Sequence, residues 1–267
     1  MVDIIIYTLL VGVCGTGLGG VVGALFKKDS NATMSLLLSF AGGVMLSIVC
    51  FDLLSSSIES SNVFVAVAFV VIGIVLVFLL NFILDRISAK NNSHLDENHP
   101  KTHDDLDELI HSEALTNPGN TSLLRAGIIM VLAIAFHNLP EGLSIGSSYA
   151  HEVNNGIFLA FIIALHNIPE GMAIVVPLIS GGMNRLKAVV LTALSGLPTM
   201  IGAVLGYLLG GIGDIGLAIS LALASGAMLY VVFGEIIPQS ILMYKSKLPA
   251  FFIMFGILLG VLLIYAI

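Results

Sequence analysis

The sequence of 267 residues contains no tryptophan, only two cysteines and few charged residues, which make up 10% of the chain. Soluble domains carry about 25% charged residues, so this scarcity excludes an ordinary globular domain, a disordered chain and a nucleic-acid-binding protein. Cys14 and Cys50 lie within apolar runs, where we expect packing residues and not a disulfide framework. The chain is 57% hydrophobic with a mean hydropathy of +1.05, which indicates a protein embedded in the lipid bilayer.

Apolar runs divide the chain into segments of membrane-spanning length. A helix needs about 20 apolar residues to cross a hydrocarbon core about 30 Å thick. We therefore predict an all-α membrane protein with eight transmembrane helices. The expected spans are residues 3–26, 32–55, 62–84, 123–149, 154–180, 186–212, 214–243 and 248–267.

Basic residues are missing from three of the seven connections and from both termini. All ten Lys and Arg residues lie in or beside the connections that follow the first, third, fifth and seventh spans. The positive-inside rule then places both termini outside the cytoplasm of a multi-pass protein in the cell membrane. No Lys or Arg precedes Lys27, so we expect the first run to be a retained span and not a cleaved signal peptide.

Three spans recur at an offset of 183 residues. The aligned pairs are Thr16 and Thr199, Gly19 and Gly202, Gly23 and Gly206, Gly43 and Gly226, Met45 and Met228, Asp52 and Glu235, and Gly73 and Gly256. Because five spans separate equivalent helices, the copies run in opposite directions, as in the inverted repeats of many transporters. We predict a 3+2+3 arrangement: repeat 1–84, acidic loop 85–122, central two-helix unit 123–180 and repeat 181–267.

Glycines in the first and sixth spans are spaced four residues apart, a pattern that allows close helix contact. They are Gly15, Gly19 and Gly23, and Gly202, Gly206 and Gly210. This spacing is compatible with a sliding surface, a homodimer seam or plain tight packing, of which we favour the last.

The central unit contains a duplicated hexapeptide. His137-Asn138-Leu139-Pro140-Glu141-Gly142 recurs as His166-Asn167-Ile168-Pro169-Glu170-Gly171, near the middle of the fourth and fifth spans. A carboxylate at the centre of a membrane helix costs about 2.5–3.5 kcal/mol, so the two acids need compensation. A bound cation is the simplest source of it.

Helical geometry brings the polar residues of each hexapeptide to one face. His137 and Glu141 are one turn apart, as are His166 and Glu170, so two imidazoles and two carboxylates can converge. Such a set suits Zn²⁺, and Fe²⁺, Mn²⁺, Co²⁺ and Cd²⁺ can use the same ligands. The prolines also free the carbonyl groups four residues earlier, and Asn138 and Asn167 can offer amide oxygens beside the first position.

The doubled His-Asn-x-Pro-Glu-Gly motif resembles the ZIP family of divalent-metal transporters, and within it the GufA-like branch. Eight spans, a long polar connection after the third, and the run Ser-Phe-Ala-Gly-Gly-Val-Met-Leu at 39–46 support the resemblance. The resemblance implies that the central His and Glu residues ligate the transported metal, with no prosthetic group, and that Asn138 and Asn167 line a second metal position.

The resemblance also marks three less central features. Relatives with two metal positions often have a Glu in the sixth span where this chain has Thr199, which puts a full second site in doubt. Met45 matches a methionine that approaches the metal in some relatives, although Met also fills gaps in cores. Asp52 and Glu235, toward opposite membrane faces, are candidates for attracting metal as it enters and leaves, or are simply solvated helix-end acids.

Four histidines lie among carboxylates in the 85–121 connection: His94, His99, His103 and His111. They could catch or sense metal after its release. We favour a flexible acidic linker, because the histidines lack tight ligand spacing.

We therefore predict a transporter, not an enzyme, that moves divalent transition-metal ions, Zn²⁺ foremost, into the cytoplasm by alternating access. The resemblance implies an elevator-like motion of the central site. The main rival is an intramembrane metallohydrolase, but no His-Glu-x-x-His motif or separate general base is visible. A third alternative is a metal-gated channel or sensor.

Overall fold

The structure is a computed structural model that describes residues 2–25, 31–90 and 120–266. Within these ranges every regular element is a helix, in agreement with the expected fold class. The α-helices are α1 (Val2–Leu9), α2 (Gly15–Leu25), α3 (Asn31–Ser47), α4 (Leu54–Glu59), α5 (Val63–Lys90), α7 (Asn120–His151), α8 (Val153–Ser180), α9 (Arg185–Leu194), α10 (Leu197–Gly210), α11 (Asp214–Val231), α12 (Ile237–Met243) and α13 (Leu248–Ala266). The four histidines of the acidic loop lie outside the described residues.

Seven stretches of the described chain are long and apolar enough to cross a membrane. They are Val2–Leu25, Ser35–Glu59, Val63–Phe82, Val153–Ser180, Arg185–Gly210, Asp214–Met243 and Leu248–Tyr265. They correspond to seven of the eight expected spans. The fourth, α7, is 32 residues long and is not among them. It carries the polar residues His137, Asn138 and Glu141, and all three are buried inside the protein.

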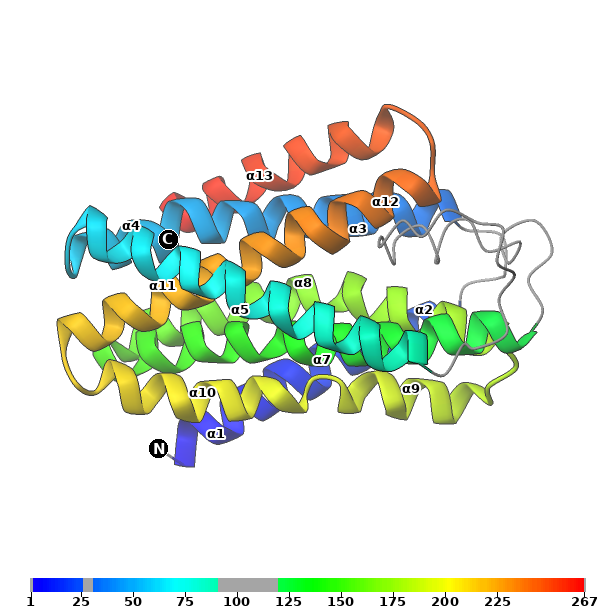
Figure 1. Cartoon of the computed structure of the whole chain (residues 1–267), viewed down its shortest axis with the longest axis horizontal. Helices are drawn as coiled ribbons and strands as arrows, with labels where there is room; N and C mark the ends of the chain where they lie inside the picture. The colour runs from blue at the N-terminus through cyan, green and yellow to red at the C-terminus, as the bar shows by residue number, and fades with distance from the viewer. Residues whose placement is uncertain (1, 26–30, 91–119, 267) are drawn as a thin grey trace.

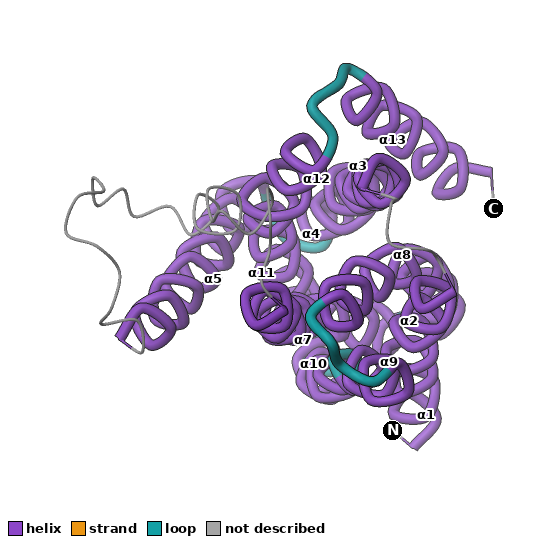
Figure 2. Tube along the Cα trace, turned by 90° about the vertical axis from the view of Figure 1, so that its right-hand side faces the viewer, coloured by secondary structure: helices purple, strands orange, loops and turns teal. Residues whose placement is uncertain are grey.

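The helices form two groups that lie side by side, as the view along the long axis shows (Figure 2). The group called here the site group contains α1, α2, α7, α8, α9 and α10. The group called the flanking group contains α3, α4, α5, α11, α12 and α13. The groups meet mainly where α7 packs on α11 and α8 packs on α3. Each expected three-span repeat is therefore divided between the two groups.

Apolar side chains fill the boundary between the groups. Met45 and Met228 of the flanking group are fully buried in one cluster with Ile145 and Ile163 of the site group. The outer surfaces of the peripheral helices are apolar as well, since Phe64 of α5 is 83% exposed and Leu258 of α13 is 69% exposed. Exposed apolar surface of this extent is what a lipid-facing helix requires.

The glycines of the first and sixth spans pack against the central helices within the chain. A Cβ atom at Gly19 would overlap the carbonyl oxygen of Ile168 on α8, and one at Gly202 would overlap that of Leu139 on α7. The favoured interpretation, tight packing, therefore accounts for them. Their effect is to bring α2 and α10 directly against the two hexapeptides.

In the described part of the chain, π-helical turns interrupt the long helices at η1 (Leu10–Cys14), η2 (Ile48–Leu53) and η4 (Val232–Ile236). The last two contain Asp52 and Glu235, which the sequence aligned at an offset of 183. Single π-helical turns occur frequently at functional sites because they change the direction of one side chain. Both acids thus lie at a local irregularity of their helix.

Candidate metal centre

Two neighbouring helices present the central polar residues to each other. His137 and Glu141 lie on α7, and His166 and Glu170 lie on α8. Both helices continue through the prolines of the hexapeptides. The glycines that end the hexapeptides face α10 and α2, because a Cβ atom at Gly142 would overlap the carbonyl oxygen of Thr199. Close packing on both sides leaves the polar face of each helix directed at its partner.

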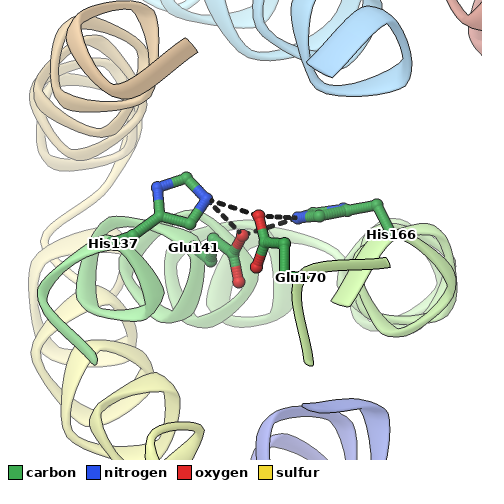
Figure 3. Close-up of side chains that lie close together, drawn as sticks. All are labelled: His137, Glu141, His166 and Glu170. Carbon is green, nitrogen blue, oxygen red and sulfur yellow. Dashed lines mark hydrogen bonds and ion pairs between the residues drawn. The ribbon is translucent and has the colours of Figure 1, made fainter. Parts of the chain in front are cut away.

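The four side chains converge on one point, as Figure 3 shows. Glu141 Oε1 lies 2.6 Å from His166 Nε2 and 3.1 Å from His137 Nε2. Glu170 Oε1 lies 3.1 Å from His137 Nε2 and 3.9 Å from His166 Nε2. The expected convergence of two imidazoles and two carboxylates is therefore found in the structure.

The cluster is almost completely shielded from solvent. Glu141 and Glu170 have no exposed surface, and the two histidines are at most 3% exposed. Ionised carboxylates at such a position are stable only when they are paired with protein donors or with a cation. Glu170 Oε2 and the Nδ1 atoms of both histidines are buried without a hydrogen-bond partner. Several polar atoms of the cluster therefore form no hydrogen bond with the described residues.

The spacing of the four ligand atoms suits a small divalent ion. One ligand atom from each residue lies within 4.8 Å of all the others. Tetrahedral Zn²⁺ with bonds of about 2.0–2.1 Å holds its ligand atoms about 3.3 Å apart, which falls inside the observed range of 2.6–3.9 Å. Two imidazole nitrogens and two carboxylate oxygens are also ligand types that Zn²⁺ accepts. The residues can hold such an ion with small adjustments.

The two asparagines of the hexapeptides differ in their contacts. The amide of Asn138 donates to the carbonyl oxygen of Ser195 at 2.9 Å, and its own oxygen is buried without a partner. The amide of Asn167 fits its surroundings when its nitrogen faces Ile163 O at 3.2 Å and Glu141 Oε2 at 3.3 Å. Asn167 is thus in contact with the cluster, whereas Asn138 ties α7 to the start of α10.

Thr199 is fully buried, and its hydroxyl, which lies beside Gly12, has no hydrogen-bond partner among the described residues. Its carbonyl lies against Gly142, as the carbonyl of its repeat counterpart Thr16 lies against Gly171. Met45 is fully buried in the apolar boundary between the groups, and its ligation of metal stays a prediction.

Asp52 and Glu235 are both half-buried in their π-helical turns. Glu235 accepts a hydrogen bond of 2.5 Å from Asn81 Nδ2. Its π-helical turn reaches the boundary with the site group, because Ile236 lies in the same buried cluster as Ile145. Sequence analysis did not single out Asn81, and the available signal was an amide within the strongly apolar third span.

Comparisons with known proteins place these features in a family. The family model described as ZIP zinc transporter matches residues 2–267. The chain is 30% identical over 141 residues to proteins named Zinc transporter ZupT from Salmonella newport, Salmonella schwarzengrund and Salmonella typhi. That alignment covers 52% of this chain and 48% of each relative, so the chain spans about half the length of the curated relatives it matches. Since the family model extends over nearly every residue, the chain belongs to the ZIP zinc transporter family.

Proposed function

We propose that this chain carries divalent transition-metal ions, with Zn²⁺ as the preferred ion and Fe²⁺, Mn²⁺, Co²⁺ and Cd²⁺ as others, through the four-residue cluster. The observation that carries the proposal is a fully buried His₂Glu₂ set between two membrane helices. Membership of the ZIP family and the printed name of the relatives, Zinc transporter ZupT, support the choice of ion. The metal is cargo in this proposal and not a resident cofactor.

An inverted repeat provides the two alternate states. The pairing of α3 with α13 has its counterpart in the pairing of α11 with α5. In the first pair Gly43 meets Gly256, and in the second Gly226 meets Gly73, which are the residues aligned at an offset of 183. The matching contacts support two copies of one three-helix unit in opposite orientation. Two equivalent pathways to one central site follow from such symmetry.

Alternating access then arises from movement of the site group along the flanking group. All four ligands lie in the site group, and the boundary cluster of Met45, Met228, Ile145 and Ile163 is apolar. Apolar surfaces lose few directional contacts when they shift. An elevator-like displacement of the site group would expose the cluster first to one side of the membrane and then to the other.

The direction of transport is into the cytoplasm. The start of α1 and the end of α13 lie at one end of the molecule, and the α8–α9 and α12–α13 connections lie at the opposite end (Figure 1). Those two connections border Arg185, Lys187, Lys245 and Lys247. The positive-inside rule assigns this basic end to the cytoplasm and both termini to the outside of the cell membrane.

Secondary roles follow for the remaining candidates. Asn138 and Asn167 line a weaker second metal position, Thr199 lies on the pathway of the metal, and Met45 approaches the metal from the flanking group. Asp52 attracts metal on the outer side and Glu235 receives it on the cytoplasmic side.

The experiment is uptake of Zn²⁺ into liposomes that contain the purified full chain. We expect uptake by the unaltered protein, and its loss in Glu141→Ala and in Glu170→Ala. A matched control is Glu152→Ala, which removes an exposed carboxylate that accepts a hydrogen bond from Asn155. Normal uptake in both cluster variants would refute the assigned site, and absence of uptake by the unaltered protein would refute transport.

A further inference from the structure

The two repeat-related acids are held in different ways. Glu235 accepts a hydrogen bond from Asn81, which lies on α5. At an offset of 183 residues Asn81 aligns with Ile264, which cannot donate a hydrogen bond. In keeping with this, no side chain of the described residues donates a hydrogen bond to Asp52. The symmetry of the fold is therefore broken at one pair of polar side chains.

The chemistry of Asn81 suits an acid that has to bind a cation. A Lys or Arg at this position would neutralise Glu235 and repel a metal ion, whereas an amide orients the carboxylate and adds no charge. The bond is made to Oε1 and leaves Oε2 available to a metal ion.

Glu235 lies where the flanking group meets the site group. It belongs to η4, and its neighbour Ile236 is buried in one cluster with Ile145 of α7. One helical turn further toward the α12–α13 connection, Gln239 Nε2 lies 3.5 Å from Met130 Sδ on α7. Glu235 and Gln239 thus occupy one face of η4 and α12 that is directed at α7. This face leads from the cluster toward the basic end of the molecule.

We propose that Asn81 is a positioning residue that holds the Glu235 carboxylate toward the central cluster, so that Glu235 takes up the divalent ion as it leaves the four ligands. This inference rests on the proposed transport function. It adds a residue and a step on one side of the membrane only, because no described side chain donates a hydrogen bond to the outer acid Asp52. In this proposal, metal release uses an acid that a hydrogen bond orients in advance.

The test measures initial rates of Zn²⁺ uptake against Zn²⁺ concentration in liposomes, together with equilibrium Zn²⁺ binding to the purified full chain. Asn81→Leu is expected to lower the maximal rate about tenfold, because it removes a hydrogen bond to a charged group. Binding at the central cluster should stay within about twofold of the unaltered protein. Ile264→Leu is the control at the repeat-related position, and its uptake should not change.

A combination of variants separates positioning from a purely structural role. If Asn81 acts through Glu235, Asn81→Leu has no further effect in a Glu235→Gln background. The double variant Asn81→Asp/Glu235→Gln restores a hydrogen bond but moves the carboxylate to α5, so uptake should remain low. Additive effects of Asn81→Leu and Glu235→Gln, or recovery of uptake in the exchanged pair, would overturn the proposal.

Failure of this inference is distinct from failure of the proposed function. Normal uptake in Asn81→Leu, with uptake still abolished in Glu141→Ala, would disprove only the role of Asn81. Retained Zn²⁺ binding by Asn81→Leu reports that the variant is folded. Should Asn81→Leu lose Zn²⁺ binding, the nearly isosteric Asn81→Asp single variant provides the decisive rate, and a normal rate there would disprove the role of the amide donor.

Discussion

The two copies of the hexapeptide, on α7 and on α8, match at five of six positions but differ in their contacts. Glu141 Oε1 lies within 3.1 Å of both histidines, whereas Glu170 Oε1 is that close only to His137. The asparagine of the α7 copy bonds to Ser195, and that of the α8 copy contacts Glu141. Near-identical segments have therefore acquired unequal roles through their neighbours, and Glu141 is the more central of the two acids.

The largest expected effect distinguishes the two acids. Glu141→Gln should weaken Zn²⁺ binding by more than about a hundredfold, because it removes the carboxylate that lies close to both histidines. For Glu170→Gln we expect a smaller weakening of Zn²⁺ binding, about one tenth of the factor found for Glu141→Gln. Equilibrium binding of Zn²⁺ to the purified protein measures both, with the thermal unfolding midpoint as the control for folding. Equal weakening would show that the two copies contribute alike.

A smaller effect is expected for the two asparagines. Asn167→Ala should lower Zn²⁺ affinity about tenfold, since Asn167 orients Glu141 from outside the ligand set. Asn138→Ala should leave the affinity nearly unchanged and reduce the free energy of unfolding by about 1–3 kcal/mol, because the Ser195 carbonyl loses its buried donor. Binding isotherms and denaturant titrations on both variants test this. A larger loss of Zn²⁺ affinity in Asn138→Ala than in Asn167→Ala would contradict these two roles.

The smallest effect concerns the threonines that face the two copies. Thr199→Glu places a carboxylate beside Gly12 of η1, where the native hydroxyl has no partner among the described residues. We expect it to change the ratio of Zn²⁺ to Cd²⁺ uptake about threefold and to add a second bound equivalent of Zn²⁺. The matched variant Thr16→Glu removes a hydroxyl that already donates to Gly12 O at 2.7 Å. If Thr16→Glu, and not Thr199→Glu, bound a second equivalent of Zn²⁺, the second metal position would lie next to the α8 copy of the hexapeptide.

Sequence reasoning succeeded where a pattern has a direct physical cause. Apolar runs long enough to cross a bilayer predicted seven spans that the structure also contains. The same criterion of apolar length predicted the helix α7, although it carries polar residues. The doubled motif predicted the four residues that converge, because each pair lies one turn apart on its helix. Both predictions depend on local geometry, which the order of residues specifies.

Other features depended on contacts between distant segments. The separation of each repeat into two groups was not foreseen, because it depends on which helices pack together. Nor did the sequence indicate that Asn81 would meet Glu235, which is 154 residues away along the chain. Helical periodicity identifies the face on which a side chain lies, but it does not specify the partner of that face.

By itself the sequence determined the membrane-embedded helices, the pair of buried acids and the four residues that converge, because hydropathy and one-turn spacing follow from the chain alone. Only the tertiary structure decided which carboxylate lies closest to which histidine. The shortest distance in the cluster, 2.6 Å, joins Glu141 of α7 to His166 of α8 and not to the histidine on its own helix. That distance is set by how closely α2 and α10 hold the two helices, and glycines such as Gly19 and Gly202 allow this approach.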